Sequence, residues 1–109
     1  MNKKTTPPSS QRVVKMQWVP VDQIEITNTR IKEGKVRAII KQGIDLDKLK
    51  CFPAWKDPET GRFIITDGNH RLTAMKRLGY EKAPIAELTR EEFDYIKFSF
   101  RAIDLVIVP

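Results

Sequence analysis

The pattern of apolar and polar positions changes its period most sharply between residues 63 and 79. Residues 63–66 form an apolar, largely β-branched run, which predicts a buried strand. Asp67 and Gly68 interrupt this run, because aspartate is a favoured helix N-cap and glycine permits a tight turn. The next residues predict a helix with a core-facing stripe and a glycine stop: Leu72, Ala74, Met75, Leu78 and Gly79.

Weaker patterns before this stretch predict short elements. Residues 13–19 are typical of a strand, which Pro20 limits to the edge or the end of a sheet. Residues 21–26 indicate a short strand or a turn. Between residues 32 and 42, apolar residues recur at i, i+3 and i+4, which predicts a helix closed by Gly43: Val36, Ile39 and Ile40.

A hairpin is predicted immediately before the central stretch. Residues 52–56 and 62–66 are strand-like, and the residues between them, 57–61, carry proline and glycine at turn positions. The hairpin therefore leads directly into the strand–turn–helix stretch.

The C-terminal third predicts a strand, a helix and a packed tail. Residues 84–88 indicate a short strand that begins at proline. Thr89 and Glu92 have the spacing of a capping box, which predicts the start of a helix. Its apolar stripe is Phe93, Ile96, Phe100 and Ile103. Residues 105–109 are too apolar for a free terminus, so we expect them to pack against the domain or a partner.

Composition narrows the class of protein. The chain has 109 residues, 40% hydrophobic and 31% charged, which fits one domain with a single core. It has no apolar run of membrane-spanning length and no signal-peptide core, so we expect a cytoplasmic protein that does not contact membranes. The single cysteine, Cys51, excludes an intrachain disulfide, and one cysteine with one histidine argues against a zinc site.

The net charge of +6 is concentrated at the N-terminus. Four basic residues precede the first acidic residue, Asp22: Lys3, Lys4, Arg12 and Lys15. The rest of the chain has 16 basic and 14 acidic residues and is nearly neutral. We predict a disordered basic arm over residues 1–12 and a single domain over residues 13–109. The arm either contacts nucleic-acid phosphates or only aids solubility.

The candidate chemistry lies at the predicted strand-to-helix junction, residues 67–71. Backbone N–H groups and the positive end of the helix dipole are exposed at such a junction, which makes it a ready anion site. Arg71 adds a forked cation that suits phosphate. The alternative is that Asp67 only caps the helix, Arg71 is a solvated surface charge and His70 fills a polar niche. The residues alone leave both interpretations open.

The sequence resembles the ParB/sulfiredoxin superfamily over about residues 16–88. The residues that carry the resemblance are 65–71, then Ala74, Leu78, Gly79 and residues 83–85. The resemblance implies an α+β fold: a short mixed sheet with the motif helix and two or three further helices packed on it. It also implies that the turn cradles the phosphates of a nucleotide such as ATP, ADP or CTP.

Site residues follow from the resemblance position by position. Gly68, Asn69, His70 and Arg71 fall on the phosphate-binding box, and Arg30 falls on the arginine that helps to clamp the nucleotide in partitioning proteins. Asp67 matches the acid of the free-serine kinases, whose Asp-Gly-His-His-Arg is similar to Asp-Gly-Asn-His-Arg here. It is the candidate Mg²⁺ ligand.

Three departures limit what the resemblance implies. Sulfiredoxin has its reactive cysteine where this chain has Asn69, so sulfinic-acid reductase activity is not expected. The serine kinases have a catalytic glutamate in the loop that here is residues 27–30, with Glu25 and Glu33 only nearby. Nothing after Leu88 resembles the second nucleotide motif or the helix-turn-helix of partitioning proteins.

The leading hypothesis is a domain that binds a nucleotide or another phosphate group in a DNA-associated role. The first alternative is a phosphotransferase or nuclease in which Asp67 and His70 are catalytic. The second is a nucleic-acid-binding module that uses the basic arm and the side chains of Arg71, Lys76 and Arg77. The C-terminal helix and the apolar tail are a candidate surface for a homodimer.

Overall fold

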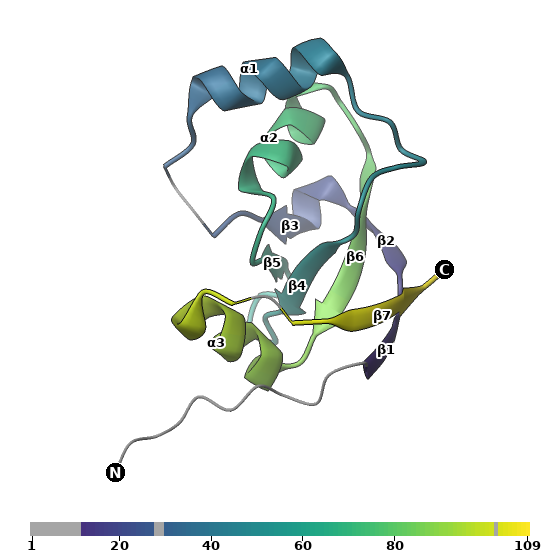
Figure 1. The fold of residues 1–109 in the computed structure, drawn as a ribbon, viewed down its shortest axis with the longest axis vertical. Coiled ribbons are helices and arrows are strands. Elements are labelled where there is room, and N and C mark those ends of the chain that lie inside the picture. The colour runs from purple at the N-terminus through teal and green to yellow at the C-terminus, as the bar shows by residue number, and fades with distance from the viewer. Residues whose placement is uncertain (1–11, 28–29, 102) are drawn as a thin grey trace.

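The computed structural model describes residues 12–27, 30–101 and 103–109 and contains a five-stranded mixed sheet (Figure 1). Its strand order is β2-β6-β4-β5-β3, with β6 in parallel pairing to β4 and antiparallel pairing to β2. The strands β4 and β5 form the predicted hairpin. The bounds are β2 Gln17–Pro20, β3 Ile24–Glu25, β4 Phe52–Lys56, β5 Phe63–Ile65 and β6 Lys82–Leu88.

In the described part of the chain, three α-helices accompany the sheet: α1 Glu33–Gln42, α2 Asn69–Arg77 and α3 Arg90–Ser99. The helices α1 and α2 pack against each other at one end of the molecule, and α3 lies at the other end beside β4 and β6 (Figure 1). A short 3₁₀ helix, Val21–Gln23, precedes β3. The core joins α2 to the sheet through fully buried apolar side chains: Ile24, Phe52, Ile65, Leu72, Met75 and Ile85. The predicted α+β class, with the motif helix and two further helices, is confirmed.

A separate two-stranded sheet joins the first and last described segments. Strand β1, Arg12–Lys15, pairs in parallel with β7, Leu105–Val108. The backbone of the apolar tail is therefore paired with β1, but the side chains of Val106, Ile107 and Val108 stay exposed, so the expected packing is only partly present. The single strand predicted over residues 13–19 is wrong, because the chain breaks at Met16 into β1 and β2, which pair in different sheets.

Two of the predicted apolar helix stripes include residues that are not buried. Leu78 is 43% exposed, because six residues rotate a helix about 120° away from the side on which Leu72 lies. The last helix ends at Ser99, and Phe100 closes it in the left-handed conformation with a φ of 58°. Phe100 is therefore 91% exposed, and the helical stripe stops at Ile96.

The predicted capping box is confirmed and is tied to the first strand. Thr89 accepts a hydrogen bond from the Glu92 amide, and the Glu92 carboxylate accepts one from the Thr89 amide. The same carboxylate accepts two hydrogen bonds from Arg12, at 2.6 and 2.8 Å. Arg12 thus belongs to β1 rather than to the predicted arm; residues 1–11 lie outside the described residues.

None of the described helices has the length and the apolar character needed to cross a membrane.

Candidate functional site

The predicted strand, turn and helix are present, with a different cap. Strand β5 ends at Ile65 and α2 begins at Asn69. The N-cap is Gly68, in the left-handed conformation with a φ of 88°, and Asp67, predicted as the cap, is exposed and makes no capping bond. Glycine is required here for a second reason, because a Cβ at position 68 would lie 2.8 Å from the ring of Phe52. The close approach of the turn to β4 therefore requires glycine at the cap position, residue 68.

Arg71 lies in the first turn of α2 and has an unusual environment. Its guanidinium carbon is 4.5 Å from the ring centroid of Phe52, a cation–π contact with a fully buried side chain. Among the described residues its Nε is buried without a hydrogen-bond partner. Burial lowers the pKa of Arg71, and the negative charge of Asp67 opposes this effect. Arg71 is therefore a partly desolvated cation that contacts an aromatic ring and makes no ion pair with a described carboxylate.

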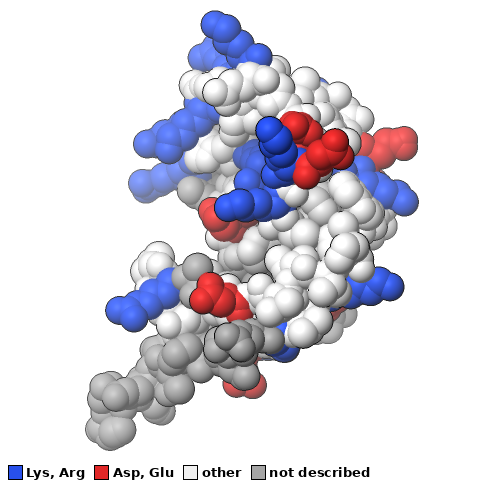
Figure 2. Space-filling view, turned by 45° about the vertical axis from the view of Figure 1, so that its right-hand side comes forward, with Lys and Arg blue, Asp and Glu red and all other residues white. Residues whose placement is uncertain are grey.

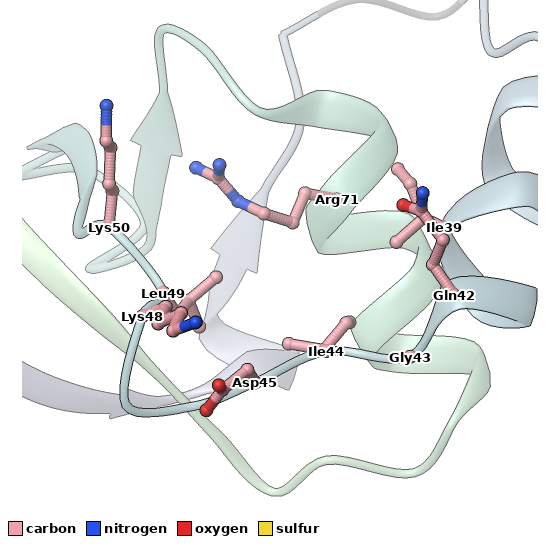
Figure 3. A pocket seen from close by; sticks show the side chains of 9 residues that line it. All are labelled: Ile39, Gln42, Gly43, Ile44, Asp45, Lys48, Leu49, Lys50 and Arg71. Carbon is pink, nitrogen blue, oxygen red and sulfur yellow. The ribbon is translucent and has the colours of Figure 1, made fainter.

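A cavity of about 500 Å³ lies beside Arg71 (Figure 3). The side chain of Arg71 extends from α2 toward the segment between α1 and β4, where Lys48 and Lys50 also line the cavity. The one acidic residue in the lining is Asp45, so the described walls carry a net positive charge. The rest of the lining is mostly apolar or uncharged: Ile39, Gln42, Gly43, Ile44 and Leu49.

Sequence reasoning missed the two lysines of this wall. Lys48 and Lys50 belong to a connection without helical or strand periodicity, so no pattern indicated which way they face. Only the chain path that brings residues 44–50 past α2 places them near Arg71.

Asn69 and His70 make contacts that were not predicted. The Asn69 Oδ1 accepts a hydrogen bond from the Thr27 amide at 2.9 Å, and the His70 Nε2 accepts one from the Lys32 amide at 3.1 Å. With Nε2 accepting, the proton of the neutral ring is on Nδ1. The two side chains thus hold the described ends of the segment that carries Arg30, which is itself exposed.

Removing these two acceptors is expected to act locally. In Asn69→Ala the Thr27 amide loses its acceptor, so its hydrogen exchange should quicken several-fold, whereas the Lys32 amide should respond only to His70→Ala. Exchange measured residue by residue by NMR checks this. Asn69→Asp, which keeps an acceptor oxygen, is the control and should preserve the protection of Thr27. Unchanged exchange at both amides would contradict the assignment.

The carboxylates considered for acid–base chemistry are engaged elsewhere. Glu33 accepts two hydrogen bonds of 2.6 Å from Arg77, and these bonds lower its pKa. Glu25 lies 3.5 Å from the Arg62 guanidinium. Within the described residues no group of three histidine, cysteine, aspartate or glutamate side chains could hold a metal ion. Asp67 is the acid that remains at the turn.

The basic face predicted to contact nucleic acid is largely committed within the protein. Lys76 donates a hydrogen bond to the carbonyl of Ile24 at 2.7 Å, and Arg77 is paired with Glu33. Figure 2 shows acidic side chains directly beside a group of basic ones in the upper half of the visible face.

Cys51 is half-buried immediately before β4, and burial raises the pKa of its thiol. A thiol with a raised pKa is a weaker nucleophile at neutral pH.

Comparisons with known proteins place this geometry in a fold family. No protein-family model matches the chain. The ATP-dependent L-serine kinase SbnI from Staphylococcus aureus is 29% identical over 83 residues, which are 72% of this chain and 30% of that protein. A C-terminally truncated SbnI structure has a TM-score of 0.59 at 26% identity and covers 71% of this chain and 32% of its own. Arabidopsis thaliana sulfiredoxin has a TM-score of 0.58 at 13% identity, with coverages of 79% and 97%. Caulobacter crescentus ParB complexed with CTP-γ-S has a TM-score of 0.50 at 21% identity, with coverages of 80% and 54%.

The chain has the ParB/sulfiredoxin fold. It spans about a third of the length of SbnI. The same holds for a free serine kinase variant solved in complex with AMP, which has a TM-score of 0.59 at 23% identity and covers 72% of this chain and 33% of its own. In the ParB/sulfiredoxin fold of this chain, residues 68–71 form the turn from β5 into α2, beside the cavity that Arg71 lines.

Proposed function

We propose that this domain binds a nucleotide, or another ligand that carries a phosphate, at the start of α2. The observation that carries the proposal is Arg71, a partly buried guanidinium whose Nε has no partner among the described residues. A buried, unpaired donor costs free energy, and an anion that accepts its hydrogen bond recovers that cost. Arginine also offers the forked geometry that phosphate accepts.

The surroundings of Arg71 suit such a ligand. The first turn of α2 presents N–H groups without intrahelical acceptors at the positive end of the helix dipole. Lys48 and Lys50 supply further positive charge from the opposite wall. The apolar part of the lining, which includes Ile39, Ile44 and Leu49, fits a nucleobase better than a second phosphate. The cavity volume of about 500 Å³ is within the usual range of ligand sites, roughly 300–1,000 Å³.

The other predicted site residues take supporting roles in this proposal. Gly68 permits the close turn, Asn69 and His70 hold the segment that carries Arg30, and Asp67 faces solvent beside the turn. Mg²⁺ is usually held by one or two carboxylates together with substrate phosphates, so Asp67 would hold it jointly with the ligand. The names of the similar proteins support a nucleotide as the ligand, because they include an ATP-dependent kinase and complexes with AMP and CTP-γ-S.

Arg71→Ala is expected to weaken nucleotide binding about 10- to 100-fold, since a charge-assisted hydrogen bond contributes roughly 1.5–3 kcal/mol. Calorimetric titration with ATP, ADP, AMP and CTP, with and without Mg²⁺, measures this loss. Arg37→Ala, which removes the same charge from an exposed position on α1, is the control and should bind within about twofold of the wild type. Wild-type protein that binds none of these nucleotides would refute a nucleotide as the ligand.

A second candidate function is phosphoryl transfer to a small acceptor. A further hollow, of about 300 Å³, opens on the Asp67 side of the turn and is lined by Thr66, Asp67, Ile96, Phe100 and Arg101. An acceptor hydroxyl in this hollow would lie next to the carboxylate of Asp67, the remaining acid–base group with His70. Product formation from ATP that His70→Ala abolishes would support this function, and wild-type protein without turnover would exclude it for the acceptors tried.

A DNA-associated role receives less support from the geometry. Arg12, Lys76 and Arg77, which were expected to contact phosphates, bond to groups of the protein itself. The likeness to the C. crescentus ParB complexed to its centromeric site supports such a role only through the shared fold, because the identity is 19%.

A further inference from the structure

The sheet formed by β1 and β7 has an unguarded edge. Among the described residues β7 pairs with β1 alone, so the opposite edge of β7 presents its backbone N–H and C=O groups without a strand beside it. Natural edge strands usually carry a charge, a proline or a bulge that discourages further pairing. The four residues of β7, Leu105–Val108, contain none of these devices.

The outer face of this sheet is apolar as well. Val13 is 62% exposed, and its register partner Val106 is 44% exposed. Val108 is 36% exposed and lies on the same side of β7, because alternate residues of a strand share a face. Three valines thus form a continuous apolar strip across the two strands, ending at the free edge.

We propose that β7 pairs with β7 of a second copy of this chain, antiparallel about a two-fold axis, to give a continuous four-stranded sheet. The pairing requires residues that face each other to lie on the same face of the sheet, which allows Val106 to lie opposite Val106 of the second copy. The three-valine strips of the two copies then join into one apolar surface.

The distribution of charge around β7 favours a second copy of β7 as the partner strand. The residues of β7 carry no charge, so pairing β7 with itself places no like charges opposite each other across the new strand pair. In the register centred on Val106, Asp104 of each copy lies opposite Val108 of the other. Lys15, the register partner of Val108 on β1, is one strand further, so Asp104 and Lys15 of the second copy lie in the same row and on the same face, two strands apart. The symmetry supplies this complementary pair twice.

Sedimentation of the wild type and two matched variants tests the proposal. The wild type should pass from monomer to dimer as its concentration rises from micromolar to millimolar. Val106→Lys places like charges opposite each other and should weaken the dimer about fivefold or more. Val13→Lys adds the same charge one strand away from the edge and should weaken it about twofold at most. A wild type that stays monomeric, or equal effects of the two lysines, would overturn the proposal.

Cross-linking provides a readout that does not depend on charge or on a change in fold. In a Cys51→Ser background, Val106→Cys should form an intermolecular disulfide under mild oxidation, whereas Val13→Cys should not. Disulfide formation at Val13→Cys without formation at Val106→Cys would overturn the register.

Discussion

Gly68→Ala is expected to lower the free energy of unfolding by about 3 kcal/mol. The backbone φ of 88° costs a non-glycine residue roughly 1–2 kcal/mol, and overpacking a buried site adds about 1–3 kcal/mol. The overpacking is specific: an added Cβ would lie 2.8 and 2.9 Å from two ring carbons of Phe52, which is fully buried and cannot withdraw. Urea denaturation followed by circular dichroism measures the loss.

Gly79→Ala is the matched control for this substitution. Gly79 also has a positive φ, 83°, but a Cβ there would meet nothing within 4 Å. It should therefore lose only the conformational part, about 1 kcal/mol. Equal losses at the two glycines would show that contact between the turn and Phe52 contributes nothing. A larger loss at Gly68 would confirm that the start of α2 is pressed against β4.

Glu92→Ala is expected to destabilise the fold by about 3 kcal/mol. Glu92 is 1% exposed, and its carboxylate is shared between the Thr89 amide and the guanidinium of Arg12. Removing it takes away the carboxylate that pairs with Arg12, which keeps only its hydrogen bond to the Glu87 carbonyl, and removes half of the capping box. Breaking a buried ion pair costs roughly 3–5 kcal/mol. The loss should lie at the low end of this range because the Arg12 side chain is 35% exposed. Thermal or urea unfolding at neutral pH measures the difference.

The same pair should make stability depend on pH. Burial alone would raise the pKa of Glu92, but the hydrogen bonds from Arg12 and Thr89 and the charge of Arg12 lower it overall. A carboxylate with a lowered pKa stabilises the fold above its unfolded pKa, about 4.3, and this contribution is lost as the pH falls through the lower folded value. The difference in the free energy of unfolding between wild type and Glu92→Gln should therefore be largest near pH 7 and shrink below about pH 4.

Asp94→Ala, which breaks the exposed pair with Arg90, is the control and should lower the free energy of unfolding by less than about 0.5 kcal/mol.

The local signals in the sequence were sufficient for most of the fold. The run at residues 63–66, the turn residues 57–61 and the spacing of Thr89 and Glu92 each depend on chemistry within a few residues, and each predicted its element correctly. The errors arose where a distant partner decided the outcome. The break at Met16 follows from pairing with two different sheets, and the position of Arg12 follows from a carboxylate 80 residues away.

The candidate site divides in the same way. The turn at residues 68–71 was predictable because a strand, a glycine and a helix start are contiguous in the sequence. The anchoring of Thr27 by Asn69 and of Lys32 by His70 was not, because each hydrogen bond joins segments about 40 residues apart. The contribution of Lys48 and Lys50 to the cavity wall likewise depends on the path of a connection that has no periodic pattern.

The contact between Arg71 and Phe52 has a consequence for how a ligand would enter. A guanidinium held by a carboxylate must exchange one anion for another, which adds a step that breaks an ion pair. A guanidinium that rests on an aromatic ring has no ion pair to break there and can keep its ring contact throughout. Asp67 acts on Arg71 through its charge, but no described carboxylate forms an ion pair with it. The association rate of an arriving anion would then be governed by diffusion and electrostatic attraction rather than by the breaking of such a pair.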